Sequence, residues 1–234
     1  MSGILYLIPS PLGENEPREV IPASVFDLLP HLQHFVVEEL RTVRRYLSKA
    51  GLKGKIAELN LYELNEHTQQ KDVERYVQIL KEGNDVGLIS EAGLPAVADP
   101  GALLVELAHK NDIEVRPFVG PSSLMLALMA SGLNGQCFAF TGYLPVKPDE
   151  RKAKIRTIEK ISAQLRQSQI IIETPYRNDQ FFADLLATCS ANTRICVAAD
   201  ITLPTQFIKT KSVAEWKKSP VVIGKRPCVF VMLA

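Results

Sequence analysis

Cysteine is scarce in this sequence and widely scattered. The 234 residues contain four cysteines, Cys137, Cys189, Cys196 and Cys228, and no two of them form a close pair. Zinc ribbons and small disulfide-stapled folds need closely spaced pairs. The spacing therefore argues against a metal site or a disulfide framework, and we expect buried free thiols.

Long apolar runs are also missing. No stretch approaches the roughly 20 apolar residues that cross a bilayer, and the start MSGILY lacks the charged region and cleavage site of a signal peptide. We therefore expect a cytoplasmic protein with no membrane partner. The net charge of +1 neither demands nor excludes nucleic acid, so local clusters of charge must decide that question.

The common signatures of several enzyme classes are absent too. No Gly-x-Gly-x-x-Gly follows an expected strand, and no phosphate-binding Gly-Lys-Ser/Thr occurs. There is no Gly-x-Ser-x-Gly elbow and no metal-binding pair of histidines on a helix. These absences disfavour a dinucleotide, a nucleoside triphosphate, serine-hydrolase chemistry and a zinc protease.

What the sequence does contain is a regular alternation of strand-like and helix-like segments, which predicts an α/β fold with a largely parallel sheet. The length suits two domains, which we place at residues 1–118 and 119–234. Helical spacing of apolar residues predicts helices near 40–50, 73–80, 103–108 and 149–165, and a helix at 124–130 that is apolar all round and expected to be buried. Strands are expected at residues 4–8, 35–37, 59–64, 86–89, 113–119, 138–141, 169–173, 195–199 and 229–233.

Four loops that leave expected strands have unusual compositions. They are rich in proline, glycine and short polar residues: 9–13 (PSPLG), 90–101 (SEAGLPAVADPG), 120–123 (GPSS) and 173–177 (ETPYR). Ligands of open α/β sheets bind at the carboxyl ends of the strands, and fixed backbone paths can approach a ligand closely. We therefore expect a ligand site at this edge.

The loop at 90–101 allows a plainer explanation, in which Asp99-Pro100-Gly101 is only a turn and Asp99 caps the next helix. Four such loops at one edge favour the ligand site instead. With Glu91 and Asp99 in the loop, a ligand with positive charge or hydrogen-bond donors would fit.

As an ordered set, these motifs resemble a known family. Together with 38–44 (EELRTVR), 64–67 (LNEH) and 142–145 (GYLP), they are similar to the tetrapyrrole methylase superfamily of S-adenosylmethionine-dependent methyltransferases, and within it to the methyltransferases of small-subunit ribosomal RNA. The resemblance covers nearly the whole chain. It implies two α/β domains with the cofactor cleft between them, S-adenosylmethionine as cofactor and a homodimer. By position, it implies cofactor contacts from Pro9, Glu91, Ala92, Gly93, Asp99, Gly120, Pro121, Ser122, Ser123, Tyr143 and Pro175.

The resemblance also suggests a reaction, ribose 2′-O-methylation of small-subunit ribosomal RNA. The hydroxyl would lose a proton during transfer, and Glu39, Glu66 and His67 are candidate general bases by motif position. Arg41, Arg44 and Arg45 lie on one face of a predicted helix, where they could meet RNA phosphates. Two alternatives stay open: methylation of a small molecule such as a tetrapyrrole, and a protein that binds the cofactor without catalysis.

Overall fold

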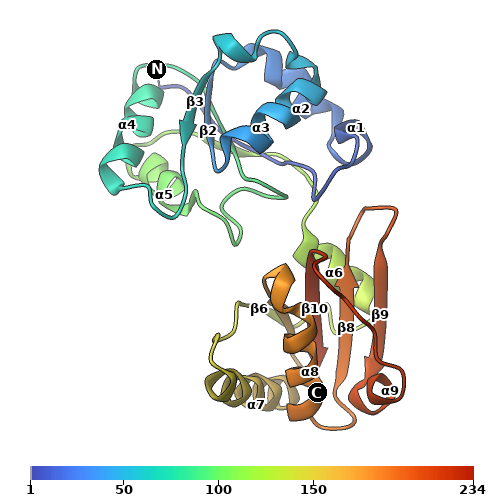
Figure 1. The fold of residues 1–234 in the computed structure, drawn as a ribbon. Coiled ribbons are helices and arrows are strands. Elements are labelled where there is room, and N and C mark those ends of the chain that lie inside the picture. The colour runs from blue at the N-terminus through green and yellow to red at the C-terminus, as the bar shows by residue number, and fades with distance from the viewer. Residues whose placement is uncertain (1) are drawn as a thin grey trace. The chain divides into compact units, whose positions relative to one another are not determined.

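The computed structural model describes residues 2–234, which divide into two compact units. The first ends at Ser122 and the second runs from Ser123 to Ala234, so the division falls a few residues after the boundary suggested by the sequence. Each unit combines a sheet with helices, and the predicted α/β class is confirmed (Figure 1).

The first unit contains a five-stranded sheet in the order β3-β2-β4-β1-β5, with every pair of neighbours parallel. Its carboxyl ends therefore lie along one edge, as expected for this half. The strands are β1 (Leu5–Ile8), β2 (His34–Val37), β3 (Asn60–Glu63), β4 (Val86–Ile89) and β5 (Val115–Pro117).

Helices pack against both faces of this sheet and make two apolar cores (Figure 1). One core joins the sheet to α1 (Pro17–Val20), α2 (Ala23–Leu28), η1 (Leu29–His31), α3 (Leu40–Leu47) and the π-helical turn η2 (Ser48–Leu52). The other joins it to α4 (Gln70–Lys81) and α5 (Ala102–Lys110). A short 3₁₀ turn, η3 (Ile56–Glu58), precedes β3. Because both faces are covered, the inner strands β1, β2 and β4 read as short, mostly apolar runs.

The second unit has a mixed sheet in the order β6-β7-β10-β8-β9. Only β6 and β7 pair in parallel, and the other neighbours are antiparallel. The expectation of a largely parallel sheet is therefore wrong for this unit. The strands are β6 (Phe138–Gly142), β7 (Ser168–Ile172), β8 (Arg194–Ala199), β9 (Phe207–Ser212) and β10 (Cys228–Leu233).

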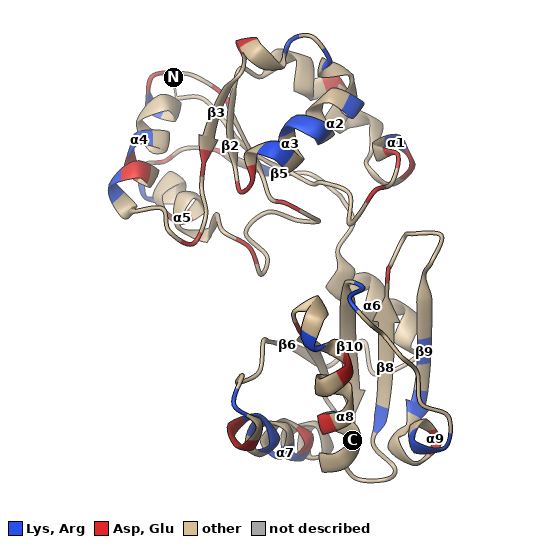
Figure 2. Cartoon of the chain, in the orientation of Figure 1, with Lys and Arg blue, Asp and Glu red and all other residues tan. Residues whose placement is uncertain are grey.

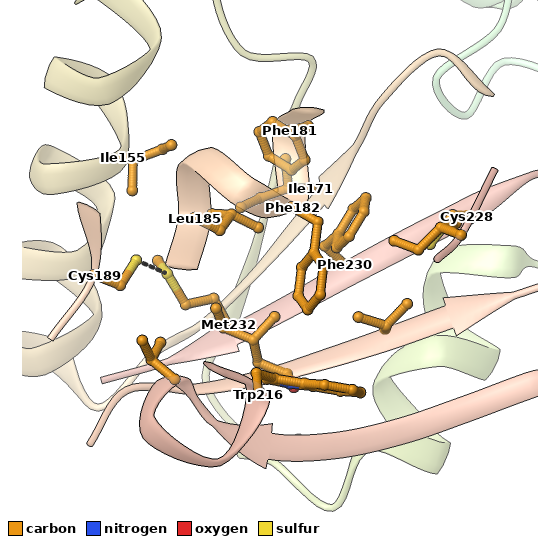
Figure 3. Close-up of a cluster of buried hydrophobic side chains, with 14 of the residues drawn as sticks. Ile155, Ile171, Phe181, Phe182, Leu185, Cys189, Trp216, Cys228, Phe230 and Met232 are labelled. Atoms are coloured by element: carbon orange, nitrogen blue, oxygen red, sulfur yellow. Dashed lines mark hydrogen bonds between the residues drawn. The ribbon is translucent and has the colours of Figure 1, made fainter. Parts of the chain in front are cut away.

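One face of the second sheet carries the main core of this unit, shown in Figure 3. Phe230 and Met232 of β10 pack there against α7 (Pro148–Leu165), α8 (Asn178–Thr188) and α9 (Val213–Lys218). The rings of Phe182 and Trp216 meet edge-on at 5.3 Å, and the Trp216 indole donates a 2.8 Å hydrogen bond to the Ile195 carbonyl. This core holds the sheet whose edge carries the loop at 173–177.

Two sequence-based expectations for the second unit need correction. Helix α6 (Ser123–Ser131) is not buried all round, because only its Leu124 face packs on the sheet and 76% of Met129 is exposed. The four cysteines are free, but Cys137 is only partly buried, since it stands just before the edge strand β6. Strand β9 and helix α9 lie in a segment that the sequence analysis did not assign.

Candidate functional site

Two of the predicted loops are joined directly by their backbones. The Ser10 N–H donates to the Gly93 carbonyl at 2.9 Å, and the Gly93 N–H donates back to the Ser10 carbonyl at 3.1 Å. The Ser10 hydroxyl adds a hydrogen bond of 3.2 Å to the Ser90 carbonyl. The loop after β1 and the loop after β4 therefore behave as one unit at the carboxyl edge of the first sheet.

A third loop closes on the same place, and glycine makes this possible. A Cβ atom on Gly120 would lie 2.1 Å from the Cβ of Pro9, so only a residue without a side chain fits against that ring. Gly93 has a φ of +84°, and a Cβ there would lie 3.5 Å from the Pro121 carbonyl oxygen. The structure thus brings together Pro9, Gly93, Gly120 and Pro121, four of the predicted cofactor contacts.

Carboxylates gather beside these loops. Glu38 directly follows β2, and its Oε2 accepts a hydrogen bond of 2.9 Å from the Glu91 N–H. Burial raises the pKa of Glu91, and the negative charges of Glu38 and Glu39 raise it further. Burial, followed by the charge of Glu38, also raises the pKa of Asp99 to about 6. Several carboxylates therefore lie close together at this edge, and a bound cation would reduce the repulsion between them.

Sequence reasoning assigned no role to Glu38, although it belongs to a motif that supports the resemblance. Its position at the carboxyl end of β2, the strand beside β4 in the parallel sheet, could have placed Glu38 near the loop after β4.

A buried hydroxyl lies within the same cluster. Ser90 is 2% exposed, and its Oγ has no direct hydrogen-bond partner among residues 2–234. The hydroxyl is nevertheless close enough to lower the pKa of Asp99, against the stronger effect of burial. Buried polar atoms are rarely left without a partner, and Asp99 is the group beside which the Ser90 hydroxyl lies.

Asp99 does not cap the helix that follows it. The N-cap of α5 is Gly101, with a φ of 130° and no side-chain hydrogen bond. Ala96 and Ala98 of the same loop have positive φ angles of 64° and 63°. This left-handed conformation costs energy for a residue with a side chain. The explanation in which Asp99 caps the next helix is therefore wrong. Ala92, at the tip of the same loop, is exposed.

The three predicted general bases do not form one cluster. Glu39 caps α3 by accepting hydrogen bonds from the Arg41 and Thr42 N–H groups at 2.9 and 2.5 Å, and these bonds lower its pKa. Glu66 and His67 lie in the loop after β3, pair with each other at 3.5 Å and are 83% and 84% exposed. Within the described chain, no hydrogen bond or ion pair links Glu39 to either of them.

The predicted RNA-binding arginines are all exposed on α3, which is blue along much of its length in Figure 2. Arg45 forms an ion pair of 3.2 Å with Glu14, which also lies 3.7 Å from Lys49. Arg41 is close enough to lower the pKa of Glu39 further. Arg44 has no ion-pair partner in residues 2–234, so its charge is open to an outside anion.

The remaining predicted contacts fall at the junction and in the second unit. Ser122 ends the first unit, and Ser123 begins α6. Tyr143 follows β6, and Pro175 follows the parallel neighbour β7, so both stand at the same edge of the second sheet. Their role in cofactor binding stays a prediction.

A buried ion pair between Arg151 and Asp184 holds the chain that follows Tyr143. Arg151 donates to Asp184 from Nε at 2.8 Å and from Nη2 at 2.6 Å, and it also reaches the Pro145 and Val146 carbonyls. The pair ties α7 to α8 and to the chain that follows Tyr143. The positive charge of Arg151, in the first turns of α7, is therefore structural.

In residues 2–234, no three His, Cys, Asp or Glu side chains are grouped so that they could hold a metal ion. None of the helices in this range is long and apolar enough to cross a membrane.

Comparison with known proteins places this site in a family, although no protein-family model matches the chain. The chain is 32% identical over 204 residues to "Ribosomal RNA small subunit methyltransferase I" of Xylella fastidiosa, covering 84% of this chain and 67% of that protein. The Vibrio cholerae protein of the same name is 30% identical over 212 residues, covering 91% and 69%.

A solved structure agrees in fold. The uroporphyrin-III C-methyltransferase of Thermus thermophilus, complexed with S-adenosylhomocysteine, matches with a TM-score of 0.60 at 16% identity, over 99% of this chain and 97% of that one. This likeness establishes a tetrapyrrole methylase fold. With the sequence identity to the two bacterial relatives, it shows that the chain belongs to the ribosomal RNA small subunit methyltransferase I family.

Proposed function

We propose that this protein transfers a methyl group from S-adenosylmethionine to a ribose 2′ hydroxyl of small-subunit ribosomal RNA. The observation that carries the proposal is the closure of three glycine- and proline-rich loops beside the carboxylates Glu38, Glu91 and Asp99. The name shared by the relatives supports the substrate class. The S-adenosylhomocysteine in the Thermus protein supports the cofactor.

The first unit fits this cofactor chemically. S-adenosylmethionine brings a methyl group on a positively charged sulfonium, together with an ammonium group. Carboxylates whose pKa values are raised by burial and mutual repulsion gain most from a neighbouring positive charge. The Ser90 hydroxyl lies beside Asp99, and Gly93 and Gly120 let backbone atoms come close.

Most of the work left to the protein is positioning. Methyl transfer from a sulfonium is an in-line displacement whose leaving group needs no acid, so rate is gained by holding the acceptor oxygen about 3 Å from the methyl carbon. The three joined loops and the hydrogen bond from Glu91 to Glu38 give the rigid frame that such alignment needs.

A ribose hydroxyl also has to lose its proton. Glu39 is a weak candidate for accepting it, because two backbone hydrogen bonds stabilise its ionised form. Glu66 and His67 are exposed and keep their proposed role. Arg44, with Arg41 beside it on α3, would meet RNA phosphates.

Transfer of labelled methyl groups tests the proposal. Small subunits from a strain lacking the gene should accept label, and nucleoside analysis should identify a 2′-O-methylated residue. Subunits from the parent strain provide the matched control, because their site is already methylated and should take up little label. Label on a small molecule of the extract, with none on RNA, would contradict the proposed substrate.

The proposal extends to a homodimer. Edge strand β6 exposes Phe138 and Phe140, each by 40%, on one face of the second sheet, and a second copy would bury them. Light scattering should give twice the 26.0 kDa chain mass, and the double change Phe138→Ser with Phe140→Ser should lower it. A wild-type protein that stays monomeric at micromolar concentration would contradict this assembly.

A further inference from the structure

The second unit presents a tyrosine ring that its fold does not use. Tyr176 lies in the 3₁₀ turn η4 (Pro175–Arg177) just after β7, is 69% exposed and takes no part in the apolar core. Its hydroxyl makes no hydrogen bond within residues 2–234. An aromatic ring gains most of its folding energy from burial, so this placement brings the fold little.

The ring is held in place by its neighbour. Arg177 donates to Glu173 Oε1 from Nε at 3.0 Å and from Nη2 at 2.7 Å. The centre of its guanidinium lies 5.2 Å from the centre of the Tyr176 ring, within the range of a cation–π contact. The Glu173 carboxylate that anchors Arg177 is 1% exposed. The exposed Tyr176 ring therefore lies against a guanidinium group that is fixed and only 24% exposed.

This support has an energetic cost. Glu173 Oε1 also accepts from the Thr174 N–H and hydroxyl, whereas its Oε2 is buried without a hydrogen-bond partner among the described residues. A buried carboxylate oxygen left unsatisfied destabilises the fold. A loop that keeps this arrangement while exposing its aromatic ring has the features of a surface shaped for binding.

We propose that Tyr176, with Arg177 behind it, is a stacking platform for an unpaired base of the RNA substrate; this inference rests on the proposed function. Proteins recognise single-stranded RNA by stacking splayed bases on aromatic rings and on arginine planes. Arg177 is already neutralised by Glu173, so the contact acts through the ring face more than through charge. Tyr143, also exposed at this edge, keeps its predicted role toward the cofactor.

The test compares three variants for binding to a fluorescent single-stranded RNA of about ten nucleotides. Tyr176→Ala removes the ring and should weaken binding roughly five- to hundredfold. Tyr176→Phe keeps the ring and loses only a hydroxyl without a partner, so it should bind like wild type. Leu165→Ala is the matched control, because Leu165 is also exposed (58%) but stands at the far end of α7.

Two further readouts identify what the ring contacts. The salt dependence of RNA binding should keep its slope in Tyr176→Ala, because no phosphate contact is lost. Affinity for S-adenosylhomocysteine, measured by calorimetry, should not change. If Tyr176→Ala loses cofactor affinity while RNA affinity is unchanged, the ring stacks on the adenine of the cofactor and the inference is overturned.

The inference and the proposed function can fail separately. A wild-type protein that methylates small subunits but binds the oligonucleotide no better than Tyr176→Ala overturns the inference alone. A wild-type protein that transfers no methyl group to RNA overturns the proposed function and the inference with it.

Discussion

The carboxylate of Glu38 accepts a 2.9 Å hydrogen bond from the backbone N–H of Glu91, and the Glu38 N–H donates to the Ile89 carbonyl at 3.2 Å. Glu38 therefore forms hydrogen bonds both with β4 and with the loop that follows it. The same contact places a negative charge under the loop, which contributes to the raised pKa values of Glu91 and Asp99.

The raised pKa of Asp99 predicts how cofactor affinity depends on pH. A positively charged ligand favours the ionised carboxylate, so affinity for S-adenosylmethionine should rise as the pH increases through about 6 and then level off. Calorimetric titrations across this range measure the effect. Asp99→Asn should flatten the profile, and an equal rise in that variant would contradict the prediction.

The stability of the unliganded protein should show the opposite sign. The pKa of Asp99 is raised from 3.8 to about 6 on folding, so the folded state binds the proton more tightly than the unfolded chain. The free energy of unfolding contributed by this group therefore falls as the pH rises from about 4 to about 6. The difference between wild type and Asp99→Asn in urea titrations isolates this contribution.

Gly120 tests the packing of the loops. Gly120→Ala puts a methyl group 2.1 Å from the Cβ of Pro9 and should lower the free energy of unfolding by about 1–3 kcal/mol, with weaker cofactor binding. Gly135→Ala is the control, because a Cβ there meets nothing within 4 Å. Equal unfolding midpoints for the two variants would show that the loops can move apart at no cost.

Glu39 distinguishes a structural role from a catalytic one. Glu39→Ala should reduce the free energy of unfolding by about 0.5–2 kcal/mol, because the cap of α3 is lost. Glu39→Gln keeps one oxygen that can accept one of the two N–H groups but has no carboxylate to take up a proton, and we expect near wild-type methyl transfer. A large drop in turnover for Glu39→Gln, at unchanged stability and cofactor affinity, would instead establish it as the general base.

The buried ion pair should matter far more than an exposed one. Asp184→Ala leaves Arg151 buried without its counter-charge and should cost about 3–5 kcal/mol of unfolding free energy. Glu114→Ala breaks the pair with Arg116, in which both side chains are about half exposed, and should change the free energy of unfolding far less. Chemical denaturation of both variants provides the comparison, and a similar loss in each would refute the structural role of Arg151.

The arginines of α3 should differ in their contribution to RNA binding. Arg44→Gln should reduce the slope of log affinity against log salt by about 0.9, the loss of one phosphate contact. Arg45→Gln should change the slope less, because Glu14 already neutralises Arg45. Filter binding of small subunits at several salt concentrations separates the two, and equal slopes for wild type and Arg44→Gln would exclude a phosphate contact.

The first unit was the more predictable part of the fold. Its inner strands β1, β2 and β4 are short and covered on both faces, so each reads as a mostly apolar run such as Val86–Ile89. Parallel pairing then sends every following loop to one edge, and this is why the meeting of Pro9, Gly93 and Gly120 could be anticipated. Their composition also carried the family resemblance.

Strand β9 could not be recognised from its residues. Lys209 and Lys211 give it the look of a solvated basic segment, but it pairs with β8 at the edge of the second sheet. Edge strands often carry lysine, which discourages pairing with other chains. The charge of these residues therefore gave no indication of a strand.

The contributions of Glu38 and Arg151 depend on distant partners. Glu38 meets a backbone group of the loop after β4, 53 residues later in the chain, and Arg151 of α7 meets Asp184 of α8, 33 residues later. Neither contact follows a local period, so no window of sequence reveals it. Only the assembled sheet and helices bring these groups within hydrogen-bond range.

The paired backbone hydrogen bonds between Ser10 and Gly93 attach the 90–101 loop independently of the side chains that would contact a ligand. Attachment of the loop and choice of ligand can therefore change separately. Main-chain atoms hold the loop, so the identity of the acidic side chain beyond Ser90 does not determine whether the loop stays attached. A substitution at Glu91 can change which ligand is preferred without breaking the backbone hydrogen bonds that hold the loop. Related proteins could therefore differ in the ligand that this edge accepts while keeping the same loop arrangement.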